Sequence, residues 1–173
     1  MLSPPTDAHK NPAYRWGALT LMAALAGILI ALGAQYFGGM VPCPLCLQQR
    51  YAFYVGIPAL FMGLAMIGAD QHRNAAIIFI LVSIAFLANA GLGVYHAGAE
   101  WKFWPGPDTC AAGDFAADAK TSILERLKNA KVVRCDEAAG RFLGLSFAGW
   151  NVFLSTALCI GALQAAFSVQ NKN

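Results

Sequence analysis

The sequence predicts an all-α integral membrane protein: a bundle of four helices with one long loop. Of its 173 residues, 58% are hydrophobic and 12% are charged, whereas about 25% of the residues of an ordinary soluble domain are charged. Four apolar runs are each long enough to cross a bilayer, which takes about 20 residues. The chain length suits a single membrane domain over residues 1–173.

The first apolar run covers about residues 16–37 and contains no charged residue. It is longer than the apolar region of a secretory signal peptide, which spans roughly 7–15 residues, so we expect a membrane span and not a cleaved leader. A short loop of about residues 38–45 follows, with glycine and proline residues that favour a turn. The second span then covers about residues 46–68.

The third and fourth spans are expected over about residues 75–96 and 142–168. Asn89, inside the third span, should face the other helices, because an amide is better placed against protein than against lipid. Cys159, inside the fourth span, is expected to be an inert apolar filler.

The only long loop covers about residues 97–141. It begins with aromatic residues, which suit the membrane surface. Over residues 115–130, apolar side chains recur every four residues and charged ones take the other faces, a pattern that predicts a short amphipathic helix along the bilayer. A solvated helix packed on the loop has the same pattern and remains an alternative.

Four spans place both loops that carry cysteines on one side of the membrane and both termini on the other. Lys10 and Arg15 precede the first span, and the turn after it holds no basic residue, which favours cytoplasmic termini. The long loop disagrees, because it contains seven Lys and Arg residues beside seven Asp and Glu. We favour the first indication, since exchangeable disulfides need an oxidising compartment such as the bacterial periplasm.

Residues 42–50, PCPLCLQQR, hold two thiols two residues apart, a spacing typical of redox pairs. If Cys43 is the helix N-cap and Pro44 the first helical residue, Cys46 lies in the first turn, where the helix dipole favours a thiolate. Arg50 follows one turn deeper on the same face. Its charge could stabilise that thiolate or a bound anion, or its side chain could extend to the membrane surface.

Two simpler interpretations of the Cys43–Cys46 pair remain open. It could be a static disulfide, or half of a zinc site, although a second half with suitable spacing is missing and we therefore predict no metal. A second pair, Cys110 and Cys135, lies in the long loop. Four cysteines allow three pairings, and the loop pair could also be a structural staple.

Nucleic acid is not an expected partner. The formal charge of +3 is small, and no basic run or basic patch interleaved with aromatic residues occurs.

Taken together, these motifs resemble the disulfide bond formation protein B (DsbB) family, the quinone-linked inner-membrane thiol oxidases of Gram-negative bacteria. The resemblance covers nearly the whole chain. The resemblance rests on residues 42–50, His96, WPGPDTC at 104–110, Cys135 and FLGLS at 142–146. The family often has another residue type at the position of Gln49, and this departure puts nothing catalytic in doubt.

The resemblance implies a role for each cysteine. A reduced, periplasmic DsbA-like protein would attack the Cys110–Cys135 disulfide and form a mixed disulfide with Cys110. Cys135 would exchange with Cys43, which passes the electrons to the first pair. Cys46, as a thiolate, would approach a membrane quinone, either ubiquinone or menaquinone. DsbA is a strong oxidant, near −120 mV, so its reoxidation needs an acceptor of still higher potential.

The same resemblance implies that Arg50 stabilises the thiolate and the reduced quinone, and that His96 lines the quinone site, unless His96 is an ordinary interfacial histidine.

Three rival functions are less favoured. A protein like vitamin K epoxide reductase would place its loop cysteines before the Cys-x-x-Cys pair. A scaffold with structural disulfides would not turn over with quinone. A haem protein would need more histidines within the spans than His96 alone.

Overall fold

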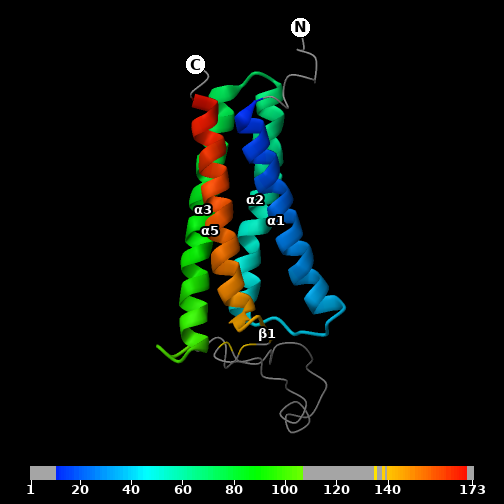
Figure 1. Cartoon of the computed structure of the whole chain (residues 1–173), viewed down its shortest axis with the longest axis vertical. Helices are drawn as coiled ribbons and strands as arrows, with labels where there is room; N and C mark the ends of the chain where they lie inside the picture. The colour runs from blue at the N-terminus through cyan, green and yellow to red at the C-terminus, as the bar shows by residue number, and fades with distance from the viewer. Residues whose placement is uncertain (1–10, 107–134, 136–137, 139, 171–173) are drawn as a thin grey trace, which may run out of the picture.

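The computed structural model describes residues 11–106, 135, 138 and 140–170. Four long helices run up and down in chain order (Figure 1): α1 (Pro12–Tyr36), α2 (Pro44–Gly68), α3 (His72–Glu100) and α5 (Phe147–Gln170). Each is long and apolar enough to cross a membrane. The predicted all-α four-helix bundle is therefore confirmed, whereas Cys110 and the amphipathic helix expected at 115–130 lie outside the described residues.

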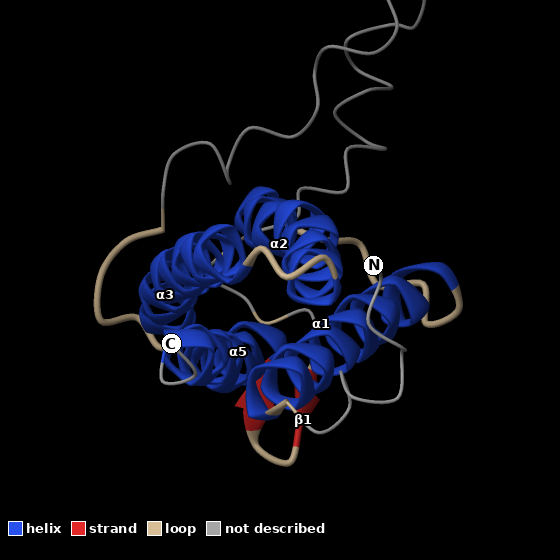
Figure 2. Ribbon diagram, turned by 90° about the horizontal axis from the view of Figure 1, so that it is seen from above, coloured by secondary structure: helices blue, strands red, loops and turns tan. Residues whose placement is uncertain are grey.

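The helices form a ring in which each one packs mainly against two neighbours. Going round the ring, α1 contacts α2, α2 contacts α3, α3 contacts α5 and α5 contacts α1, an arrangement that Figure 2 shows from above. The connection between α2 and α3 lies at the same end as the start of α1 and the end of α5. The opposite end gathers the start of α2, the end of α3 and the start of α5, and this end carries the cysteine motif.

Three of the helices extend beyond the apolar runs from which they were predicted. Helix α1 starts at Pro12, because the Asn11 side chain accepts a hydrogen bond of 3.0 Å from the Ala13 backbone nitrogen and caps the helix. Helix α2 starts two residues before the predicted span, at Pro44. Helix α3 was expected over residues 75–96 but continues to Glu100. Its last turn therefore adds Glu100 to the cysteine end of the bundle.

The fourth helix starts later than expected, at Phe147 and not near residue 142. Residues 141–146 form a small antiparallel hairpin of β1 (Arg141–Phe142) and β2 (Leu145–Ser146). Leu143 and Gly144 make its turn with φ of 53° and 83°, as a tight two-residue hairpin turn requires. Ser146 then accepts a hydrogen bond of 3.2 Å from the Gly149 backbone nitrogen, so its side chain caps the start of α5.

Polar side chains inside the bundle connect α3 to α5. Asn89 is buried and donates to Ser155 Oγ at 2.9 Å and to Asn151 Oδ1 at 3.4 Å, which confirms that it faces the other helices. Cys159 is half-buried, and its sulfur lies 3.2 Å from Ser83 Oγ. These contacts hold the two helices together where no water competes for the hydrogen bonds.

Small residues allow α1 and α5 to approach closely, and Gly161 gives a test of this packing. A Cβ on Gly161 would collide with Thr20 Oγ1, which is held in place by donating to the Trp16 carbonyl at 2.8 Å. We expect Gly161→Ala to destabilise the fold by about 1–3 kcal/mol through overpacking, seen as a lower Tm of the protein in detergent.

Gly91→Ala on α3 is the matched control, because nothing lies within 4 Å of the Cβ it would add. Alanine is favoured over glycine in a helix by about 1 kcal/mol, so this variant should keep or raise the Tm. Equal behaviour of the two variants would contradict close packing at Gly161.

Candidate active site

The cysteine motif starts α2 in the way that its sequence predicted. Cys43 is the N-cap, with φ −75° and ψ 164°, and Pro44 is the first helical residue. The Cys43 sulfur accepts a hydrogen bond of 3.2 Å from the Cys46 backbone nitrogen. A sulfur thus takes the place of the usual capping oxygen, and the helix start holds both thiols on one turn.

The two thiols touch, and both are free. Their sulfurs lie 2.8 Å apart, and neither belongs to a disulfide. Cys43 is buried and Cys46 is half-buried. The pair therefore needs little movement to close into a disulfide, whose S–S bond is about 2.05 Å long.

Hydrogen-bond donors converge on the Cys43 sulfur. The Cys46 thiol, His96 and the Cys46 backbone N–H together lower the pKa of Cys43 well below its usual value, with the Cys46 thiol as the largest cause, although burial acts in the opposite direction. The sequence indicated Cys46 as the thiolate of the pair. The donors that surround Cys43 make it the sulfur better able to carry negative charge when both thiols are reduced.

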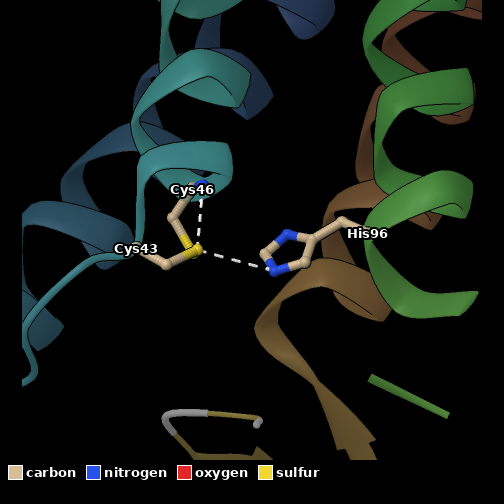
Figure 3. A group of neighbouring side chains, drawn as sticks. All are labelled: Cys43, Cys46 and His96. Carbon is tan, nitrogen blue, oxygen red and sulfur yellow. Dashed lines mark hydrogen bonds between the residues drawn. The ribbon is translucent and has the colours of Figure 1, made fainter. Parts of the chain in front are cut away.

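His96 comes from the last turns of α3 and faces the cysteines across the bundle (Figure 3). Its ring is 2% exposed. Nε2 lies 3.5 Å from Cys43 Sγ, and Nδ1 lies 3.1 Å from the amide nitrogen of Gln49. His96 is thus a buried member of the site, with a partner at each ring nitrogen.

Glu100 is a site residue that the sequence analysis placed in the long loop. It lies one turn after His96 on α3, and its Oε1 is 3.7 Å from His96 Nε2. Its side chain is 5% exposed and receives a hydrogen bond from Ser146 in β2. The spacing of four residues between a histidine and an acid on one helix was the available signal. Gln49, from α2, was noted only as a departure from the family pattern.

The Arg50 side chain contacts α1. Its guanidinium donates to the Gln35 side-chain oxygen and, at 3.5 Å, to the Ala31 carbonyl. Both partners belong to the last turns of α1, so Arg50 connects α1 to α2 at the cysteine end. A guanidinium has five N–H groups, and these two contacts leave donors for a further acceptor.

Cys135 is the loop cysteine that the structure describes, and it packs directly on the first pair. It is 1% exposed and forms one buried cluster with Cys43 and Leu45, against which Cys46 also packs. Cys135 is disulfide-bonded. The fold therefore brings a disulfide sulfur from the long loop to the reduced pair at the start of α2.

The ligand atoms of Cys43, Cys46 and His96 lie within 4.8 Å of one another, close enough to share a metal ion. The distance between the sulfurs disfavours zinc, however. Two thiolates bound to tetrahedral zinc at about 2.3 Å each are about 3.7 Å apart, whereas these sulfurs are 2.8 Å apart. The geometry is nearer to that of a thiol pair before disulfide closure.

Comparison with known proteins gives a consistent result. The family model described as "Disulfide bond formation protein DsbB" matches residues 14–165. The disulfide bond formation protein B of Aromatoleum aromaticum is 34% identical over 155 residues, covering 84% of this chain and 87% of the relative. That of Saccharophagus degradans is 34% identical over 152 residues, covering 82% and 86%. No solved structure matches. A match over nearly the whole chain, together with the paired cysteines at one end of a four-helix bundle, shows that this chain belongs to the DsbB family.

Proposed function

We propose that this chain is a membrane thiol oxidase that reoxidises a soluble DsbA-like dithiol protein and passes the electrons to a membrane quinone. The observation that carries the proposal is the buried cluster in which disulfide-bonded Cys135 contacts the free thiol of Cys43. Two thiol pairs in contact can exchange, because a thiolate attacks a disulfide sulfur through a mixed disulfide. Membership in a family of disulfide bond formation proteins supports the same role.

The electrons move in two balanced exchanges. The dithiol of the soluble protein gives two electrons and two protons to the loop pair, Cys110 and Cys135, and itself becomes a disulfide. The loop dithiol then reduces a Cys43–Cys46 disulfide. Cys135 attacks Cys43 and Cys46 leaves as the thiolate, and Cys110 then attacks Cys135 of this mixed disulfide and releases Cys43. The loop pair is again a disulfide and the first pair a dithiol, which are the states of Cys135, Cys43 and Cys46 in the structure.

A quinone fits the donor groups next to this pair. When bound, it accepts two electrons and two protons as the first pair returns to a disulfide. Within the described part of the chain, Arg50 has N–H donors beyond those that contact α1, and they suit a quinone oxygen as hydrogen-bond acceptor. Half-buried Cys46 and buried His96 are the other groups that would line the site, and the kind of quinone stays open.

The location follows from the chemistry of the cysteine end. We place the chain in the bacterial inner membrane, with the cysteine end in the periplasm and both termini in the cytoplasm, because disulfides persist only in an oxidising compartment. Four candidate spans support a multi-pass membrane protein with the start of α1 and the end of α5 on the same side.

The oxidase reaction can be tested with the purified protein. On addition of a reduced DsbA-like protein and a soluble quinone, the quinone absorbance should fall. Cys43→Ser and Cys46→Ser should each reduce this rate to background. Cys159→Ser is the matched control, because Cys159 is also a free thiol but lies against Ser83 within the bundle. Wild-type protein that leaves the quinone oxidised, or full activity without Cys43 or Cys46, would refute the relay.

Arg50 should affect quinone use more than the dithiol exchange. Arg50→Gln removes the charge, and loss of a charged hydrogen bond costs about 1.5–3 kcal/mol, so we expect the KM for quinone to rise about tenfold or more. Arg73→Gln, at the opposite end of α3, should leave the KM unchanged. An unchanged KM in Arg50→Gln would show that Arg50 serves only to connect α1 to α2.

The lowered pKa of Cys43 predicts an unusual pH profile for its alkylation. A depressed pKa keeps the thiolate as pH falls below the range in which an ordinary thiol protonates, and the thiolate is lost only near the depressed value. Iodoacetamide labelling of Cys43, followed by mass spectrometry, should therefore change little between pH 9 and 7. His96→Asn should raise the pH at which the labelling rate falls to half of its maximum, and His72→Asn should not. A wild-type profile like that of a free thiol would contradict the prediction.

A further inference from the structure

Gln49 lies in the site but has no role in the proposed reaction. Its side chain is buried, with 6% of the residue exposed, on the turn of α2 that follows Cys46. Its amide nitrogen, Nε2, lies 3.1 Å from His96 Nδ1. The neighbouring Gln48 has the same side chain but is exposed. The two glutamines therefore differ in what they contact and not in chemistry.

The contact between Gln49 and His96 determines where the imidazole carries its proton. An amide nitrogen only donates hydrogen bonds, so with the Gln49 amide in this orientation Nδ1 of His96 accepts and the neutral ring holds its proton on Nε2. Nε2 faces Cys43 Sγ at 3.5 Å and Glu100 Oε1 at 3.7 Å. A proton on Nε2 therefore points toward the two groups of the site that become anions.

We propose that Gln49 is a positioning residue that fixes His96 as the Nε2–H tautomer, so that the ring donates a hydrogen bond to Cys43 and does not act as its base. The proposal rests on the proposed function, in which Cys43 is the exchanging sulfur. Gln49 itself touches neither sulfur in any described contact. It acts through the ring, as partners of metal-bound histidines do when they fix the tautomer through the other nitrogen.

The charged and titratable groups around His96 fit this assignment. Cys43 and Cys46 face it from α2, and Glu100 faces it from α3. Arg141 of β1 acts on Glu100 electrostatically. Because Glu100 Oε1 lies 3.7 Å from Nε2, its negative charge favours a proton on Nε2 and would favour a doubly protonated ring at low pH. An amide can turn its oxygen toward Nδ1–H in that state, whereas a carboxylate can only accept.

An isosteric substitution distinguishes a hydrogen-bond donor at position 49 from an acceptor. Gln49→Glu replaces the donor with an acceptor of nearly the same shape. The carboxylate requires a proton on Nδ1, either in the Nδ1–H tautomer or in the doubly protonated ring. Gln48→Glu adds the same charge one residue away on the exposed face and is the matched control.

The test is the tautomer itself, measured by NMR on reduced, full-length protein in detergent at pH 8 with ¹⁵N-labelled histidine. The chain has three histidines, and His96→Asn assigns the signals of interest. We expect His96 Nδ1 to be unprotonated and Nε2 protonated in the wild type and in Gln48→Glu, and Nδ1 to be protonated in Gln49→Glu. A wild-type ring with its proton on Nδ1, or Gln49→Glu signals equal to those of the wild type, would overturn the proposal.

A second variant tests the consequence for the sulfur. Gln49→Leu removes the donor at similar size, so Nδ1 loses its hydrogen-bond partner and the preference for Nε2–H weakens. We expect the pH at which Cys43 alkylation falls to half of its maximum to rise by about one unit, a tenfold change in the acid dissociation constant of the thiol, while the Tm stays within a few degrees of the wild type. An unchanged midpoint of the alkylation profile would reject the positioning role. Neither measurement uses quinone or a dithiol protein, so failure of the oxidase assay leaves this test intact.

Discussion

The contact between Cys43 and His96, across α2 and α3, is the constraint on which the site depends. The two residues are 53 positions apart in sequence and meet because the helices between them match in length. Cys43 lies 25 residues before Gly68 and His96 lies 24 residues after His72, so at about 1.5 Å per residue both are about 36–38 Å from the turn that joins the helices. An antiparallel pair of membrane spans therefore brings sulfur and imidazole to the same level.

This level lies at the end of the bundle, and the distribution of polar groups follows from that position. In the middle of the bundle the described hydrogen bonds join neutral groups, such as Asn89 and Ser155. Titratable groups gather where the helices end: His96 and Glu100 lie on the last turns of α3, and Ser146 of the hairpin forms a hydrogen bond with Glu100. Ionisable groups are costly at the centre of a membrane and less costly near its surface. The hairpin and Cys135 then cover the site, so these groups are buried by protein and not by lipid.

Local patterns predicted the parts of this arrangement that depend on local structure. Apolar run lengths gave the four helices, and Cys43 followed by Pro44 gave the start of α2. The hairpin was not predicted, because the apolar residues 142–146 are equally compatible with a helix start, and only the positive φ of Leu143 and Gly144 distinguishes the two. The partners of His96 were not predicted either. Gln49 and His96 lie on different helices, and the rotation of each helix about its axis decides whether they meet.

The Cys43–Cys46 pair and Cys159 have different surroundings, and the difference favours a redox-active pair over a structural disulfide. A structural disulfide needs only the correct spacing and an apolar environment. Burying an amide, an imidazole and a carboxylate around it would cost free energy and would not stabilise the disulfide. Cys159, against the Ser83 hydroxyl within the bundle, has the surroundings of an inert thiol. Cys43 instead has hydrogen bonds from Cys46 and His96 that lower its pKa, and a disulfide-bonded neighbour in Cys135. Donors at a sulfur stabilise its thiolate, and the thiolate is the form that attacks a disulfide and leaves from one.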